Sequence, residues 1–311
     1  MPYSADATTL RSPDIKYLPR LTDRIEYLFI ARGRIEQTRT GVEVWLEVDG
    51  LPVRATIPIG NLALLGLGNG VSITVPALTS LHQAGTTVIT TSADGLVSYS
   101  CARPLTSSSR WATAQARIHC DPNLRLQAAI HMYRARLPTA LLDSTITSLA
   151  QLRGIEGRHV RDTYSRLAAQ YGIENFRRRA QGATDPVNVG LNIGNAILYG
   201  LAATVCSALT LNPALGVIHE GNARAFLFDL ADIYKAETSI QAAFEFGSDP
   251  KPSATRKAVR MLIHEGQILK RMMEFTQGLL TGSEPDAIGL EGDRLFDPDG
   301  DVSAHANWGL T

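Results

Sequence analysis

A histidine and three carboxylates stand in two stretches of the chain where residue type and spacing could support chemistry. His219 comes just before a predicted helix that carries Asp229 and Asp232, and Glu156 opens another predicted helix beside two arginines. Hard metal ions that prefer oxygen ligands, and the chemistry of phosphodiesters, both use carboxylates and histidine that converge from separate helices. These two stretches therefore carry the functional hypothesis.

Each of these residues also has an ordinary structural explanation. Glu156 could simply complement the dipole at a helix N-terminus, His219 alone fits a core histidine, and two aspartates three residues apart fit a solvated helix face. However, the sequence around the aspartates is apolar on nearly every side, AFLFDLADIY. Carboxylates on a mostly buried helix need a cation or a metal ion to compensate their desolvation. This context favours a functional site.

These residues belong to a half of the chain whose pattern is helical. Asp121 and Pro122 suit the N-cap and first turn of a helix that continues to about residue 137. Apolar periodicity predicts further helices, in chain order a short turn at 148–153, then 156–171, 188–211, 223–246 with Asn222 as its cap, and 253–280. We expect a helical catalytic domain over 111–282.

The preceding half, from about residue 24 to residue 100, is β-like. Short runs rich in Val, Ile, Thr and Tyr alternate with turn signals, and one helix interrupts them, with Thr74 as cap, Pro76 in its first turn and Gly85 at its end. Alternating strands offer an apolar face and exposed edges, which favours a dimerisation or assembly domain over 1–100. Residues 101–110 read as a linker. The predicted fold class is α+β, a small N-terminal β-rich domain followed by a larger all-helical C-terminal domain.

Charge is unevenly distributed along the 311 residues, although the formal net charge is zero. Residues 111–281 contain nineteen Lys and Arg against fourteen Asp and Glu, whereas 282–311 contain seven acidic residues and one arginine. The mildly basic segment 111–281 could bind the phosphate backbone of a nucleic acid. The acidic segment 283–311 is expected to be a disordered tail.

The cysteine content and the hydropathy indicate a cytoplasmic protein with no membrane partner. The three cysteines form no CxxC pair and no zinc pattern, which argues for a reducing compartment. The N-terminus lacks a secretion pattern, and no apolar run reaches the roughly 20 residues of a membrane span. The most apolar run, 196–211, contains Tyr199, Ser207 and Thr210, as a buried helix does.

Two basic clusters could contact phosphates. Arg177–Arg179 follow a predicted helix end, where a phosphate clamp and a solvated loop explain them equally well. Lys251, Arg256, Lys257 and Arg260 gather at the start of the last predicted helix, where the helix dipole disfavours cations. A bound phosphate backbone would compensate that placement.

Four sequence motifs together resemble the CRISPR adaptation integrase family ("Cas-one"), and the match looks closest to its type I-E branch. They are Glu156 in LRGIEGRHVRDTY, the run NVGLNIGNAILYG at 188–200, His219 in LGVIHEGN and the DLAD at 229–232. The resemblance implies a β-rich domain followed by a helical domain. It also implies a homodimer that assembles with a small ferredoxin-like partner ("Cas-two") on spacer and repeat DNA.

The resemblance also implies roles for individual residues. Glu156, His219 and Asp232 correspond to the ligands of a divalent ion, Mg²⁺ or Mn²⁺, and Asp229 to an additional acidic catalytic residue. The implied activity is a DNA endonuclease and an integrase that joins the 3′-hydroxyl of captured DNA to the repeat. The resemblance places Arg161, Tyr171, Tyr199 and Lys235 near the DNA path. Charge and position alone add the remaining expected DNA contacts, Arg158, Arg177, Arg178, Arg179, Lys251, Arg256 and Lys257. The alternatives are a catalytically silent DNA-binding subunit of the same fold and an unrelated helical metalloenzyme.

Overall fold

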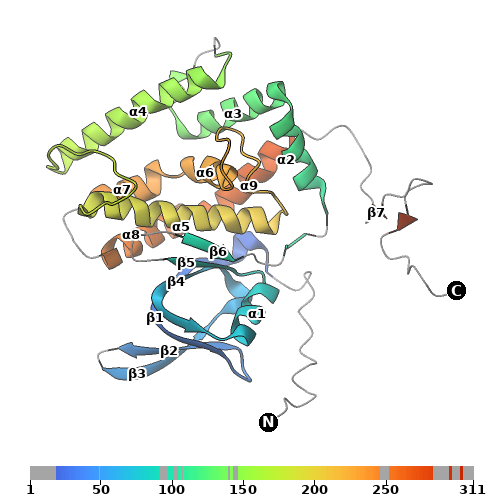
Figure 1. Ribbon diagram of the computed structural model, residues 1–311, viewed down its shortest axis with the longest axis vertical. Helices are drawn as coiled ribbons and strands as arrows, with labels where there is room; N and C mark the ends of the chain where they lie inside the picture. The colour runs from blue at the N-terminus through green and yellow to red at the C-terminus, as the bar shows by residue number, and fades with distance from the viewer. Residues whose placement is uncertain are drawn as a thin grey trace.

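The computed structural model describes residues 19–48, 50–91, 97–100, 104–106, 108–138, 141–142, 146–245 and 252–282, together with the two-residue strands β7 (Arg294–Leu295) and β8 (Val302–Ser303). A β-sheet comes first and a larger helical part follows, which confirms the predicted fold class (Figure 1). The remainder of the acidic tail, predicted to be disordered, lies outside the described residues.

The N-terminal sheet has six strands in the order β3-β2-β1-β4-β5-β6. Their bounds are β1 (Ile25–Gln37), β2 (Val42–Val48), β3 (Leu51–Ile57), β4 (Leu62–Ile73), β5 (Thr87–Thr91) and β6 (Val97–Ser100). β4 is parallel to both β1 and β5, and the other pairs are antiparallel. Short 3₁₀ turns precede β1 (Leu21–Asp23) and β4 (Ile59–Asn61).

The predicted helix between the strands is α1 (Val75–Gln83), which connects the parallel strands β4 and β5. Thr74 occupies the N-cap position, although its side chain makes no capping bond, and Pro76 lies in the first turn. Gly85 follows the helix end with φ +76°, a left-handed conformation that favours glycine. The sequence therefore placed this helix correctly.

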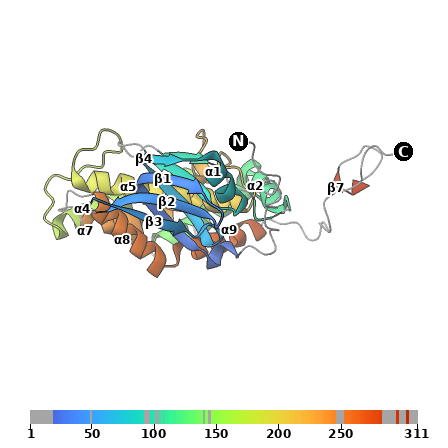
Figure 2. The ribbon, with the colours of Figure 1, turned by 90° about the horizontal axis from the view of Figure 1, so that it is seen from below.

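The two faces of the sheet pack against different helices. One apolar cluster joins Ile35, Leu65 and Val88 to Leu81 of α1. On the other face, Leu64 and Ile89 belong to the main core of the helical part. A Cβ added at Gly200 would lie 2.8 Å from Leu64 Cδ2, so this glycine allows the sheet to approach α5 closely. Figure 2 shows the strands lying across the helices.

The helical part surrounds one central helix, α5 (Pro186–Ala208). The others are α2 (Arg110–Cys120), α3 (Pro122–Arg136), α4 (Leu149–Gln170), α6 (Ala225–Asp232), a π-helical turn (Ala236–Ile240), α7 (Gln241–Glu245), α8 (Pro252–Glu265) and α9 (Ile268–Thr281). α5 is long and apolar enough to cross a membrane by length and composition, but 72% of that window is buried inside the protein, as in a core helix.

Asp121 caps α3 as predicted, because its Oδ1 accepts hydrogen bonds from the backbone N–H groups of Asn123 and Leu124 at 2.8 and 3.1 Å. The predicted break between 148–153 and 156–171 is wrong, because α4 is one helix. Ser148 and Gln151 form a capping box at its start. Gly154 and Gly157 lie inside it, and a Cβ at either position would meet nothing within 4 Å.

Three other predicted helix boundaries also differ from the structure. The helix predicted at 188–211 spans Pro186–Ala208, because Asp185 caps it by accepting a hydrogen bond from the backbone N–H of Asn188. The helix predicted at 223–246 is α6, a π-helical turn and α7, and the hydroxyl of Thr238 bonds the Tyr234 carbonyl in the irregular part at 2.6 Å. The helix predicted at 253–280 is broken at Gln267, whose φ of +48° is left-handed.

Candidate active site

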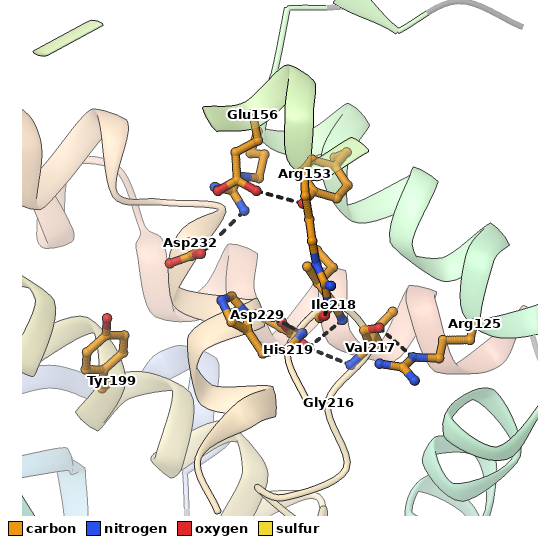
Figure 3. Close-up of polar contacts among 12 residues, drawn as sticks. Arg125, Arg153, Glu156, Tyr199, Gly216, Val217, Ile218, His219, Asp229 and Asp232 are labelled. Atoms are coloured by element: carbon orange, nitrogen blue, oxygen red, sulfur yellow. Dashed lines mark hydrogen bonds and ion pairs between the residues drawn. The ribbon is translucent and has the colours of Figure 1, made fainter. Parts of the chain in front are cut away.

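The four acidic and histidine residues singled out in the sequence come from three separate elements and face one region. Glu156 lies in α4, Asp229 and Asp232 lie in α6, and His219 lies in the segment that connects α5 to α6 (Figure 3). Glu156 stands in the second turn of α4 rather than at the helix start that was predicted. A role limited to the helix dipole is thereby excluded, since that effect is confined to the first turn.

Asp229 is fully buried and organises the segment before α6. Its carboxylate accepts hydrogen bonds from three consecutive backbone N–H groups, those of Val217 at 2.6 Å, Ile218 at 3.0 Å and His219 at 3.0 Å. The same carboxylate lies 2.7 Å from Nδ1 of the His219 ring. A carboxylate with four such contacts has all its acceptor positions used inside the protein.

The contact with Asp229 fixes the protonation pattern of His219. An ionised carboxylate only accepts, so Nδ1 carries the proton and Nε2 keeps a lone pair when the ring is neutral. This hydrogen bond also raises the pKa of His219, against the opposing effect of partial burial, and Asp229, Asp232 and Glu156 add a favourable charge interaction. A histidine whose second nitrogen is held by a carboxylate is the usual arrangement of a metal ligand.

The carbonyl groups of the same segment are held from the other side. Three consecutive carbonyl oxygens bind side chains from three helices, with His119 of α2 at 2.8 Å from Gly216, Arg125 of α3 donating at 2.7 Å to Val217, and Arg153 of α4 donating to Ile218. A Cβ at Gly216 would lie 2.3 Å from the His219 carbonyl oxygen, so no larger residue fits there without movement. The segment has no regular secondary structure, yet its backbone groups are paired.

Glu156 and Asp232 are joined by Arg136, the last residue of α3. The Arg136 guanidinium forms a salt bridge with Glu156 Oε1 and reaches Asp232 Oδ2 at 3.4 Å. The buried Tyr133, one turn earlier, donates its hydroxyl to Glu156 Oε2 at 2.6 Å. Burial, and then the bond to Glu156, raise the pKa of Tyr133, so the hydroxyl stays a donor. Both carboxylates are thus held by α3.

Lys235 and Tyr199, predicted along the DNA path, lie inside this site. Lys235 Nζ is 2.5 Å from Asp232 Oδ1 and donates to the Tyr199 hydroxyl at 2.9 Å. Burial opposes the charge on Lys235, but the adjacent Asp232 carboxylate outweighs it and raises the pKa of Lys235 to about 12. Lys235 therefore remains a cation that compensates Asp232.

The donor types of Glu156, His219 and Asp232 suit a divalent ion, because two carboxylates and one imidazole nitrogen face the same region. Within the parts of the chain that the structure describes, however, no three His, Cys, Asp or Glu side chains are close enough together to form a ligand group. Instead, the positive guanidinium of Arg136 bridges the two carboxylates. The metal assignment stays a prediction, supported by donor chemistry.

The first basic cluster divides into exposed and structural members. Arg177 and Arg179 are exposed, as are three further residues predicted along the DNA path, Arg158 and Arg161 in α4 and Tyr171 at its end. Arg178 is half-buried, and its guanidinium donates to the side chains of Asn188 and Asn192 in α5. The asparagines of the NVGLNIGNAILYG motif therefore hold the arginine segment against the central helix. A groove of about 680 Å³ beside α4 is lined by Arg161, Arg177 and Arg178.

The second basic cluster differs from what the helix-dipole argument suggested. Arg256 is half-buried, and its guanidinium lies 4.6 Å from the centre of the Phe29 ring, at the contact between α8 and the sheet. This ring supplies part of the compensation that was assigned to phosphates. Lys257 and Arg260 are exposed, and Lys251 lies outside the described residues.

Sequence reasoning missed the residues that hold the site together. Tyr133 and Arg136 lie one turn apart in a helix that was predicted, but nothing in the sequence shows that this turn meets α4 and α6. Arg153 stands one turn before Glu156 on the same helix, and that spacing was a usable signal. Arg125 and His119 gave no such signal, because they bond to backbone carbonyls.

Comparisons with known proteins agree with the resemblance in the sequence. The model of the family described as CRISPR associated protein Cas1 matches residues 135–246, which include all four site residues. The CRISPR-associated endonuclease Cas1 2 of Thermus thermophilus is 32% identical over 310 residues, covering 95% of this chain and 94% of the relative.

Solved structures give the same result. The chain of a TtCas1–DNA crystal structure superimposes with a TM-score of 0.77 at 31% identity, covering 92% of this chain and all of that chain. A casposase bound to its integration product shares the fold, with a TM-score of 0.65 at 15% identity over 84% of this chain and 92% of that one. From the match over nearly its whole length to a Cas1 endonuclease, we conclude that this chain belongs to the CRISPR associated protein Cas1 family.

Proposed function

We propose that this chain is a metal-dependent DNA integrase and endonuclease of CRISPR adaptation. In this role it joins the 3′-hydroxyl ends of captured spacer DNA to the repeat by transesterification. The observation that carries the proposal is the meeting of Glu156, His219, Asp229 and Asp232 from three elements in a member of the Cas1 family. No serine or tyrosine nucleophile is required, because the DNA hydroxyl attacks the phosphate.

Glu156, His219 and Asp232 would hold the ion, Mg²⁺ or Mn²⁺. When bound, it would polarise the scissile phosphate and stabilise charge on the attacking and leaving oxygens. The chain's own residues prepare the site. Asp229 keeps the Nδ1 proton of His219 in place and so directs the Nε2 lone pair outward, and Lys235 pairs with Asp232 Oδ1.

DNA binding is supported by exposed arginines on α4 and beside it. Arg158 and Arg161 follow Glu156 on α4, and Arg177 lines the groove beside that helix. The similar TtCas1 was solved as a complex with DNA. Phosphate contacts from such side chains supply affinity without reading sequence, which suits an enzyme that captures varied fragments.

The finer assignments rest on the resemblance in the sequence. They are the type I-E branch, the homodimer and the small ferredoxin-like partner, whereas the cytoplasmic location rests on the cysteine content and the hydropathy. The sheet supports an assembly role, because Trp45, Val48 and Leu51 expose 43%, 48% and 67% of their surface at its β2–β3 edge. Exposed apolar residues on a strand edge favour pairing with another chain.

One observation favours the second candidate, a catalytically silent DNA-binding subunit. Arg136 already neutralises the two carboxylates that would bind the ion. A protein in which this bridge never opens would bind DNA through its arginines and leave the phosphate untouched.

The decisive experiment compares joining and cleavage of branched DNA with Mn²⁺ and with EDTA. His219→Ala and Asp232→Ala should abolish both reactions and leave DNA affinity nearly intact. The matched variant Arg158→Ala/Arg161→Ala/Arg177→Ala should weaken binding and reduce the salt dependence by about 0.9 for each duplex phosphate that is no longer neutralised. Wild-type rates in the His219 and Asp232 variants would refute the integrase and favour the silent subunit.

A further inference from the structure

Arg136 is the group that most directly affects what the two carboxylates can bind. Its side chain is only 8% exposed, and its guanidinium contacts both Glu156 and Asp232, which belong to different helices. A planar guanidinium offers several N–H donors in a fixed fork, so one arginine can serve two carboxylates at once. Arg136 thereby provides the positive charge that lies between them.

Without a positive charge at this position the two carboxylates would be unstable together. Partly buried carboxylates repel each other and lose hydration, which makes their proximity costly in free energy. Arg136 prevents this, and its place at the C-terminal end of α3 suits a cation because the helix dipole is negative there. The site is therefore compensated by the protein itself.

Each carboxylate also has a second partner that does not depend on Arg136. Tyr133 donates to the other oxygen of Glu156, and Lys235 pairs with the other oxygen of Asp232. If the guanidinium withdrew from either carboxylate, that carboxylate would keep its position. The oxygens that Arg136 contacts, Glu156 Oε1 and Asp232 Oδ2, are then the ones available to another cation.

We propose that Arg136 is an internal counter-cation that competes with the divalent ion for Glu156 and Asp232 and so sets the metal affinity of the site. The inference rests on the metal-dependent function proposed above. Arg136 is a positioning residue in this scheme, since it acts through the two carboxylates. Metal binding requires the guanidinium to release at least one carboxylate, because a guanidinium and a divalent ion repel each other and need the same lone pairs.

The test is Mn²⁺ binding to the full chain without DNA, measured by the electron paramagnetic resonance signal of unbound Mn²⁺. Arg136→Gln removes the competing charge and keeps a hydrogen-bonding side chain. We expect it to bind Mn²⁺ more tightly than wild type by about tenfold or more, within the usual range of coupling between two competing ligands. Arg134→Ala, an exposed neighbour on the same helix, is the matched control and should bind as wild type does.

A second variant and a second readout guard against misfolding of the first. Arg136→Lys keeps the charge but loses the planar set of N–H donors that contacts both carboxylates. Its Mn²⁺ affinity should therefore lie between those of wild type and Arg136→Gln. In thermal unfolding, Mn²⁺ should raise the Tm of Arg136→Gln more than that of wild type, because ligand binding to the folded state adds stability according to affinity.

The outcomes separate this inference from the proposed function. If wild type binds Mn²⁺ and both Arg136 variants bind it equally or more weakly, the competition is refuted while the metal site stands. If Glu156→Gln binds Mn²⁺ as wild type does, or if no protein binds it, the metal-dependent function itself fails. Tighter binding by Arg136→Gln that Glu156→Gln abolishes supports both.

Discussion

The candidate active site has two halves that are stabilised in different ways. In the first half, the fully buried Asp229 is bound by backbone N–H groups and by His219, all within residues 217–219. In the second half, Glu156 and Asp232 keep 22% and 10% of their side-chain surface exposed and are bound mainly by the side chains of Arg136 and Lys235. Both halves contain carboxylates, but only in the second are these partners all side chains rather than backbone groups.

Because of this difference, we expect the first half to hold His219 in place and the second half to exchange one bound cation for another. Three of the four contacts of Asp229 are with main-chain N–H groups, so they persist as long as the fold does. Among the partners of Glu156 and Asp232, Arg136 is a cation on a flexible side chain, which another cation can replace. The first half is therefore a fixed support for His219, and the second is where a metal ion and a phosphate would enter.

The largest effect expected from this comparison is on stability. Asp229→Ala leaves three N–H groups without acceptors, two buried and one partly buried, and should lower the free energy of unfolding by about 3–5 kcal/mol. Asp232→Ala leaves Arg136 with Glu156 and Lys235 with Tyr199, so it should cost about 1–2 kcal/mol. Urea unfolding measures the free energy of unfolding of both variants. Equal losses in the two would contradict the proposed difference between the two halves.

A glycine pair tests how tightly the first half is packed. Gly216→Ala should cost about 1–3 kcal/mol, since its Cβ would lie 2.3 Å from the His219 carbonyl oxygen and force the segment to move. Gly154→Ala is the matched change, in a helix and with open space around it, and should stabilise by up to about 1 kcal/mol. The two values come from the same urea series. A Gly216→Ala protein as stable as wild type would show that the segment is loosely held.

Arg153 provides a smaller test of the same support. Arg153→Ala removes the donor to the Ile218 carbonyl and should cost about 1 kcal/mol, the usual net value of one hydrogen bond. Arg158→Ala, an exposed arginine on the same helix, should change stability by less than about 0.5 kcal/mol. Hydrogen exchange at residues 217–219 should become faster only in the Arg153 variant. Unchanged exchange there would show that Asp229 alone holds the segment.

The smallest effect is a dependence of the folding stability on pH in the metal-free protein. The pKa of His219 is raised above the ordinary value of 6.5, chiefly by its hydrogen bond to Asp229, so the folded protein holds this proton more strongly than the unfolded chain. That contribution to stability is complete below about pH 6.5 and is lost as the pH rises through the folded pKa. Titration of the His219 ring by NMR should give a midpoint above 6.5. A midpoint below 6.5 would contradict the hydrogen bond.

The sequence predicted the elements of the fold better than their ends. Asp121 marked the start of α3 because an N-cap acts locally, and Gly85 marked the end of α1 for the same reason. The π-helical turn was not predictable, because residues with ordinary helix propensities adopt it in response to tertiary packing. The break at Gln267 had a local signal in the preceding Gly266, although the helix predicted at 253–280 ran through it.

For the site, the sequence indicated which residues meet but not what lies between them. His219, Asp229 and Asp232 are polar residues in an apolar stretch, and this pattern can be recognised from the sequence alone. Arg136 and Tyr133 act through contacts between α3, α4 and α6, which no spacing along the chain encodes. The arginine bridge was invisible to sequence reasoning for this reason.

The central claim is that Glu156, His219 and Asp232 bind one divalent ion, and anomalous scattering from crystals grown with Mn²⁺ tests it most directly. The account predicts one manganese peak contacted by all three side chains at about 2.0–2.6 Å, with Arg136 released from at least one carboxylate. A fully ordered site in which Arg136 still bridges Glu156 and Asp232, with no manganese between them and His219, would contradict it.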